Sequence, residues 1–280
     1  MVPPSFSIGP LQNQSTQLLS TTRHSPPDFL ESSLQPLPRK EHSPKFPNIA
    51  ETSTNTRGPE IRAIILDYGE VLCLRPTEKQ IRRMADMFGI GIPQFETLYE
   101  KKRRAYDRGD LTPDRYWFGF ADEPGIHLAA DKIALLRAWD VEMWSSTNPV
   151  MIAWLEALHQ RGLRTALLSN MHADMVAKVR GEFEWMRNFD CAVFSHEVRL
   201  AKPDPKIYRH CLEGLGTTAR EALFIDDREV NITAARALGL AAIRFASVPQ
   251  LRAELERLEF PVLPSARIPR GISRNGLDPG

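Results

Sequence analysis

The chain lacks three features that would each have indicated a class of protein: abundant cysteine, a long apolar run and an excess of charge of one sign. It has three cysteines in 280 residues, and Cys73, Cys191 and Cys211 are too far apart for the usual ligand spacings of a metal site. We expect them to be reduced and mostly buried, as in a cytoplasmic protein. No apolar run approaches the roughly 20 residues of a membrane span. The amino terminus also lacks the charged and apolar segments of a secretory signal. We therefore expect a cytoplasmic protein that does not span a membrane.

Positive and negative charges almost cancel, since 36 Lys and Arg against 35 Asp and Glu give a formal net charge of +1. Bulk electrostatics therefore do not indicate a nucleic-acid partner or a membrane-surface partner. The one basic run, Lys101-Lys102-Arg103-Arg104, is expected to be a solvated helix face, with attraction of an anionic substrate as the alternative. We expect a monomer or a homodimer.

Composition and periodicity divide the chain into four regions. Residues 1–58 are dense in Pro, Ser, Thr, Gln and Asn without apolar periodicity, which predicts a disordered extension that is dispensable for folding. Residues 77–146 have helical periodicity interrupted by Gly and Pro, which predicts a small helical bundle without strands. Residues 59–76 and 147–262 alternate strand and helix, and the tail 263–280 is expected to be loose. The predicted fold is α/β, a Rossmann-like parallel sheet core with an inserted helical cap domain.

Polar residues follow the predicted strands at four places: Asp67, Ser169-Asn170, the loop residue Lys202, and Asp226-Asp227. In open α/β sheets, ligands bind beyond the carboxyl ends of the strands, so we expect these residues to converge on one edge. Each has a plain structural explanation: a turn residue, a helix cap or a solvated lysine. All of these explanations would have to hold together for the set to be without function.

The functional interpretation is a phosphoryl-transfer site. A carboxylate can attack a phosphoryl group, and clustered carboxylates are the oxygen ligands that Mg²⁺ prefers. A hydroxyl and an amide can hold phosphoryl oxygens, while a lysine offers a compact positive charge to nucleophile and phosphate. The expected catalytic residues are Asp67, Ser169, Asn170 and Lys202, and the expected metal ligands are Asp67, Asp226, Asp227 and the backbone carbonyl of Gly69.

These residues resemble the motifs of the haloacid dehalogenase-like hydrolase superfamily, in the subfamily with a helical cap inserted after the first strand. The family pattern is an apolar strand followed by Asp-x-Asp, a Ser or Thr at the second strand end, Lys-Pro-x-Pro-x-Ile-Tyr, and a late acidic pair. The resemblance runs from about residue 60 to 260, and residues 106–112 are similar to a cap segment of bacterial phosphatases. The carboxyl-terminal part is similar to the phosphatase domain of soluble epoxide hydrolases. The resemblance implies a Mg²⁺-dependent phosphomonoester hydrolase that acts on a small phosphorylated metabolite through an aspartyl-phosphate intermediate.

One position departs from the family pattern, because Gly69 replaces the second Asp. In the family that Asp is the usual acid for the leaving group, and its backbone carbonyl is a metal ligand that glycine retains. Glycine variants of the motif include phosphatases of sugar 1-phosphates, so the resemblance favours that substrate class. Glu70 or the cap residues Asp107 and Asp110 are the alternative proton donors, Glu70 being the less favoured.

Three other functions fit part of this pattern. A halide-releasing dehalogenase would keep Asp67 and Lys202 but would not need the acidic pair Asp226-Asp227. A response-regulator receiver has its acidic pair early in the chain, whereas this pair comes last, so we reject it. A non-catalytic binder of phosphometabolites or proteins, which has lost the acid at position 69, is the alternative outside the enzymes.

Overall fold

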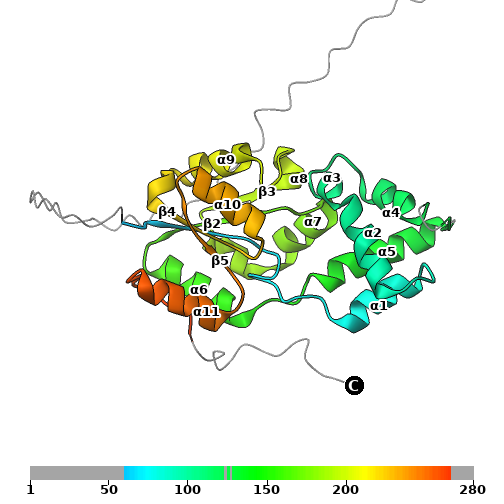
Figure 1. Cartoon of the computed structure of the whole chain (residues 1–280), viewed down its shortest axis with the longest axis horizontal. Coiled ribbons are helices and arrows are strands. Elements are labelled where there is room, and N and C mark those ends of the chain that lie inside the picture. Colours follow the sequence, from blue (N-terminus) through cyan, green and yellow to red (C-terminus); the bar gives the residue numbers. More distant parts are fainter. Residues whose placement is uncertain (1–59, 123–124, 127, 266–280) are drawn as a thin grey trace, which may run out of the picture. The chain divides into compact units, whose positions relative to one another are not determined.

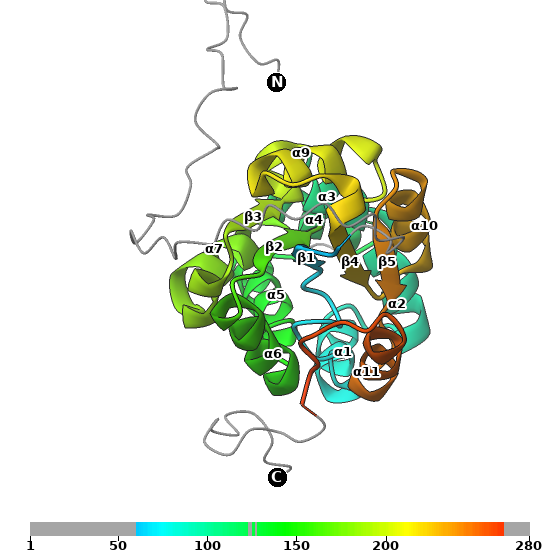
Figure 2. The same ribbon diagram turned by 90° about the vertical axis from the view of Figure 1, so that its left-hand side faces the viewer.

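A five-stranded parallel sheet forms the centre of the chain, with the strands in the order β3-β2-β1-β4-β5 (Figure 2). The computed structural model describes residues 60–122, 125–126 and 128–265; the predicted extension 1–58 lies outside the described residues, as does the tail after 265. The strands are β1 (Ala63–Leu66), β2 (Arg164–Ser169), β3 (Cys191–Phe194), β4 (Ala222–Asp226) and β5 (Ala241–Arg244). The predicted α/β class is confirmed. Ser195 directly follows β3 and begins the short helix α8 (Ser195–Val198).

The register of the sheet places two predicted site residues side by side. Leu66 of the central strand pairs with Leu167 of β2 and with Ile225 of β4. Asp67 and Asp226 each follow one of these paired positions, so both lie at the same level of the carboxyl edge. Because neighbouring positions of a parallel pair share a face of the sheet, their side chains project on the same side.

Helices cover both faces of the sheet, as the buried, continuously apolar strands require. One face packs against α6 (Pro149–Gln160), α7 (Ala173–Glu182) and α11 (Val248–Arg257). The other face packs against α9 (Pro205–Leu215) and α10 (Glu229–Ala237), so α9 and α10 lie opposite α6 and α11 (Figure 1). Local sequence signals set the helix starts, since a proline occupies the first turn of α6, α9 and α11 and an Asn, Asp or Ser caps each.

Between β1 and α6 the chain forms a separate helical layer, residues 78–143, which we call the cap. Its helices are α1 (Glu78–Asp86), α2 (Ile92–Lys101), α3 (Arg103–Asp107), α4 (Pro113–Ala121) and α5 (Ala130–Met143), and the described residues of the cap contain no strand. The cap has its own aromatic core, including Phe88, Phe95, Tyr99, Trp117 and Phe120. The chain leaves and re-enters the sheet domain at one place, where Cys73 forms an antiparallel bridge with Thr147.

The basic run of the cap is not the uniformly solvated face that we predicted. Lys101 and Arg104 are exposed, but the side chain of Arg103 is only 14% exposed and forms ion pairs with Asp107 and Asp140. A buried guanidinium keeps its charge when carboxylates and hydrogen bonds replace its water, and those partners lie on other turns of the cap. The run itself therefore gave no local sign of which residue would be buried.

None of the helices in the described part of the chain is long and apolar enough to cross a membrane. The three cysteines are free, as predicted, with Cys73 and Cys211 buried and Cys191 half-buried.

Candidate active site

The ammonium group of Lys202 lies between two buried carboxylates at the carboxyl edge of the sheet. Its Nζ is 2.8 Å from Asp67 Oδ1 and 2.7 Å from Asp226 Oδ2, and it also donates to the backbone carbonyl of Leu168 at 2.8 Å. The lysine side chain is 1% exposed. Burial alone lowers the pKa of Lys202, but Asp226 and Asp67 outweigh that effect and raise it. The lysine is therefore a fixed positive charge between the ends of β1 and β4.

Asp67 is the first residue after β1, and its two carboxylate oxygens have different surroundings. Oδ1 accepts from Lys202 and from the Tyr68 N–H at 2.7 Å. Among the described residues, none donates a hydrogen bond to Oδ2. Burial raises the pKa of Asp67 to about 7; Lys202 opposes this rise, while Asp226 and Asp227 add to it. The carboxylate thus has one oxygen held by Lys202 and the Tyr68 N–H, and one oxygen available for a reactant.

Asp226, at the end of β4, accepts hydrogen bonds from several donors. Its oxygens accept from the Asn231 amide at 3.0 Å and from the Arg228 N–H at 2.9 Å, in addition to Lys202. Asn231 is buried in the first turn of α10, and its carbonyl accepts from the Tyr208 hydroxyl at 3.0 Å. Asn231 is not among the predicted catalytic residues or metal ligands. Its spacing of five residues after Asp226, on the first turn of the next helix, is the signal that would have indicated it.

Asp227 completes a group of three carboxylates that fits a divalent cation. Ligand atoms from Asp67, Asp226 and Asp227 all lie within 4.8 Å of one another. Asp227 is half-buried, and burial followed by the neighbouring Asp226 raises its pKa to about 6. Three carboxylates against the single ammonium of Lys202 leave an excess of negative charge, and hard oxygen donors are the set that Mg²⁺ prefers. The donor chemistry of the site therefore matches the predicted metal.

The second strand end brings Ser169 and Asn170 to the same edge, in different roles. Ser169 ends β2 two residues after Leu167, the partner of Leu66, and it is buried. The Asn170 amide donates to the Lys202 carbonyl at 2.9 Å and accepts from the Lys202 N–H at 2.8 Å. Asn170 therefore clamps the backbone that carries the lysine. The contact of Asn170 with phosphoryl oxygens remains a prediction. Because one amide hydrogen is donated to the Lys202 carbonyl, only the second could make that contact.

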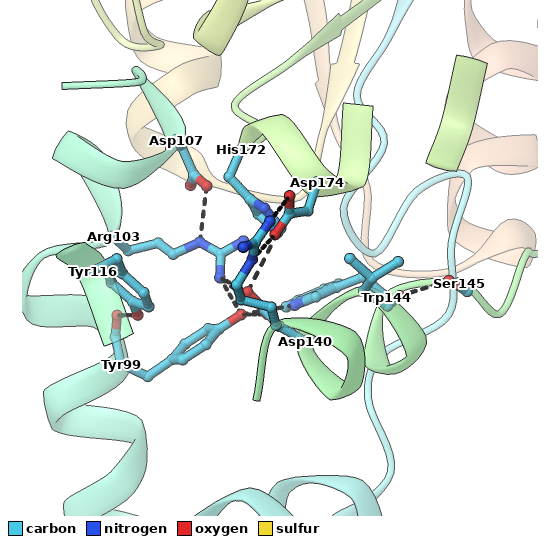
Figure 3. A network of polar contacts seen from close by, with 11 residues as sticks. Tyr99, Arg103, Asp107, Tyr116, Asp140, Trp144, Ser145, His172 and Asp174 are labelled. Carbon is cyan, nitrogen blue, oxygen red and sulfur yellow. Dashed lines mark hydrogen bonds and ion pairs between the residues drawn. The ribbon is translucent and has the colours of Figure 1, made fainter. Parts of the chain in front are cut away.

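The three alternative proton donors have different surroundings. The Asp107 carboxylate accepts a hydrogen bond from Arg103 Nε of the cap at 2.9 Å (Figure 3). Asp110 is exposed and accepts a hydrogen bond from Arg108. Glu70 follows Gly69 with a left-handed backbone, φ 53°, and its charge is among the causes that raise the pKa of Asp227. Of the three carboxylates named from the sequence, Glu70 is the one whose charge acts on an expected metal ligand.

A family model described as haloacid dehalogenase-like hydrolase matches residues 49–239 of this chain. Among curated proteins, the chain is 28% identical over 141 residues to the bifunctional epoxide hydrolase 2 of Rattus norvegicus, covering 48% of this chain and 25% of that one. It is 28% identical over 160 residues to a sesquiterpene phosphatase of Aspergillus oryzae, covering 55% and 76%. It is 24% identical over 193 residues to (S)-2-haloacid dehalogenase 1 of a Pseudomonas strain, covering 66% and 84%. The match thus spans about a quarter of the epoxide hydrolase, so the activities of that whole protein do not carry over.

Solved structures show the same fold. A HAD family enzyme from Bacteroides thetaiotaomicron, determined in complex with magnesium and inorganic phosphate, superposes with a TM-score of 0.56 at 22% identity. The superposition covers 66% of this chain and 94% of that chain. At this identity the likeness establishes the fold alone.

Proposed function

Because this chain belongs to the haloacid dehalogenase-like hydrolases, we propose that it is a Mg²⁺-dependent hydrolase of small phosphomonoesters that works through an aspartyl-phosphate on Asp67. The observation that carries the proposal is the Lys202 ammonium held between Asp67 and Asp226, 2.8 and 2.7 Å away, with Asp227 beside them. A nucleophile, a fixed cation and a cluster of metal-binding carboxylates are what phosphoryl transfer to a carboxylate requires.

In the first step Asp67 Oδ2 attacks the phosphorus atom, and the bond from phosphorus to the leaving oxygen breaks. Lys202 keeps Oδ1 and the Asp67 carboxylate in position, while Ser169 is proposed to donate to a phosphoryl oxygen as charge develops on it. The leaving oxygen departs with the bonding electrons and takes a proton from water, because Gly69 has no acid to supply it. In the second step water attacks the same phosphorus atom, which releases inorganic phosphate and restores the Asp67 carboxylate.

Asp67, Asp226, Asp227 and the backbone carbonyl of Gly69 would hold the metal ion. When bound, Mg²⁺ supplies the positive charge that lets a phosphate approach a carboxylate of like sign. Asn231 and the Arg228 N–H orient the Asp226 carboxylate for this role.

Gly69 narrows the proposed substrates to those with good leaving groups. A positioned general acid contributes about 10²- to 10⁴-fold to a rate, which is roughly 3 to 5 kcal/mol of barrier. An enzyme without one is slowed most on primary alkoxides and least on anomeric, aryl or acyl phosphates. We therefore favour sugar 1-phosphates as the substrate class.

The likeness to a haloacid dehalogenase gives a second candidate reaction. In that chemistry Asp67 would displace halide from carbon, and water would then attack the ester carbonyl. The acidic pair favours the phosphatase, because displacement of halide needs no metal whereas two added carboxylates beside the nucleophile match a cation site.

The test is a comparison of kcat/KM for a sugar 1-phosphate, the same sugar's 6-phosphate and an (S)-2-haloacid, each with and without Mg²⁺. Phosphate release that requires Mg²⁺ and is faster from the 1-phosphate supports the proposal. Halide release without phosphate release would favour the dehalogenase. Binding of the phosphates without turnover would favour the non-catalytic binder.

A further inference from the structure

The ring of His172 belongs to the sheet domain but lies inside the cap. His172 follows β2 and precedes α7, and its side chain is 0% exposed. The ring stacks on Tyr106 of the cap with centroids 4.5 Å apart and an interplanar angle of 16°. Its Nε2 is 3.3 Å from Asp140 Oδ2, which comes from α5 (Figure 3).

The cap side of this contact is a buried polar network around Arg103. The guanidinium lies 2.9 Å from Asp107 Oδ1 and 3.3 Å from Asp140 Oδ1. The Tyr99 hydroxyl donates to Asp140 at 2.5 Å and accepts from the Trp144 indole at 3.0 Å. Buried groups that satisfy one another in this way fix each other's positions (Figure 3). The network therefore holds Asp140, the residue beside the His172 ring, in a fixed position.

Stacking and shape, and not a hydrogen bond, hold the ring of His172. Among the described residues neither Nδ1 nor Nε2 has a hydrogen-bond partner, and the Asp140 contact is an ion-pair distance only. Burial lowers the pKa of His172 to about 4, against the opposing charge of Asp140, so the ring is neutral at neutral pH. His172 also occupies the N-cap position of α7 without a side-chain cap bond, so its ring does not serve that helix.

On the other side, the loop that carries His172 holds the proposed catalytic groups. Ser169, Asn170, Met171 and His172 are consecutive, and Asn170 clamps the Lys202 backbone through two hydrogen bonds. A second connection runs beside the first, since the Met171 N–H donates to Ser195 Oγ at 2.9 Å and the same hydroxyl donates to the carbonyl of Asp107 in the cap. The cap thus contacts this four-residue loop directly at His172 and indirectly, through Ser195, at Met171.

We propose that His172 is a positioning residue whose stacked ring seats the cap on the loop 169–172 and so fixes Ser169 and Lys202 for catalysis. The catalytic part rests on the proposed function; the seating of the loop does not. A group misplaced by about 1 Å costs on the order of 10² in rate, so loss of the ring should be felt at the chemical step.

The experiment compares His172→Ala, His172→Phe and the surface control Arg257→Gln, whose residue lies on α11. Two readouts are taken on the full chain: kcat and KM for p-nitrophenyl phosphate with Mg²⁺, and hydrogen exchange of residues 169–172. We expect His172→Ala to lower kcat about 10²-fold, with a smaller change in KM, and to speed exchange of the loop. His172→Phe keeps the stack and should retain the kcat and the exchange of the unchanged chain, as should Arg257→Gln.

Tyr106→Leu removes the stacking partner from the cap side and should reproduce the effects of His172→Ala, including where the alanine variant does not fold. Unchanged kcat and exchange in His172→Ala or Tyr106→Leu would overturn the proposal. A His172→Phe variant as impaired as His172→Ala would also overturn it, because the nitrogens would then carry the effect. If the unchanged chain releases no phosphate, the proposed function fails, and the exchange measurements alone decide the role of His172.

Discussion

A Cβ atom added to Gly69 would lie 3.9 Å from Asp67 Oδ2, and no closer atom outside its chain neighbours would meet it. Position 69 therefore faces the oxygen that we assign as the nucleophile, with room for a side chain. The backbone of Gly69 is not in the left-handed region, so a larger residue is accommodated there without strain. Neither a lack of space nor backbone strain therefore explains why the acid of the family pattern is absent at position 69.

Gly69→Asp should increase turnover of poor leaving groups. A restored acid is worth about 10²- to 10⁴-fold where the leaving oxygen needs a proton, and much less where it does not. We expect kcat/KM for a sugar 6-phosphate to rise more than that for the same sugar's 1-phosphate. The matched control is Gly69→Asn, because Asn has about the same size as Asp but no acidic proton. An equal gain in both variants, or no gain for the 6-phosphate, would contradict the assignment of a missing acid.

Asn231→Ala should weaken Mg²⁺ binding without removing a ligand. The Asn231 amide is 3.0 Å from both oxygens of Asp226, and outer partners of this kind contribute about 10- to 100-fold to metal affinity. The measurement is the Mg²⁺ concentration that half-saturates both activity and the shift in thermal midpoint. Asn231→Asp serves as a second variant, because it adds charge but cannot donate a hydrogen bond when ionised. A half-saturating concentration unchanged in Asn231→Ala would show that Asn231 does not orient a metal ligand.

Stability at acid pH should depend on His172. Its pKa is lowered to about 4 in the folded chain, against about 6.5 in an unfolded one, so between these values the unfolded state binds more protons. Stability is therefore lost as pH falls from about 6.5 to about 4. The charged and titratable groups that act on the pKa of His172 are Asp140, Arg103, Asp174 and His196. They are present both in the unchanged chain and in the His172→Phe variant compared with it below.

Urea unfolding at pH 7.0 and pH 4.5 measures this loss. The His172→Phe variant cannot titrate at that position, so its free energy of unfolding should fall by about 2 kcal/mol less than that of the unchanged chain. Equal losses in the two proteins would mean that His172 is protonated in the folded state at pH 4.5.

The sequence predicted the sheet and the convergence of the site because both depend on local signals. Short apolar runs ending on polar residues indicate parallel strands, and the carboxyl ends of such strands meet at one edge. For that reason Lys202 lies within ion-pair distance of both Asp67 and Asp226.

The contacts between side chains were not predictable, because they depend on partners that are distant in the sequence. A basic run is usually solvated, and burial of Arg103 follows from Asp140 on a different helix. An Asn after a strand is expected to be a helix cap or a ligand. The two hydrogen bonds of Asn170 to the Lys202 backbone depend on the contact between two loops that are distant in the sequence. A single His before a helix gives no sign that Tyr106 will stack on it.

The measurement that tests the central claim most directly is Mg²⁺-dependent hydrolysis of p-nitrophenyl phosphate by the unchanged chain and by Asp67→Asn. The substitution keeps the shape of the side chain but removes the nucleophile's charge and one metal-ligand charge. We predict turnover by the unchanged chain in Mg²⁺, its loss in excess EDTA, and a fall of at least about 10³-fold in Asp67→Asn. Near-complete activity in Asp67→Asn, or full activity in excess EDTA, would contradict the account.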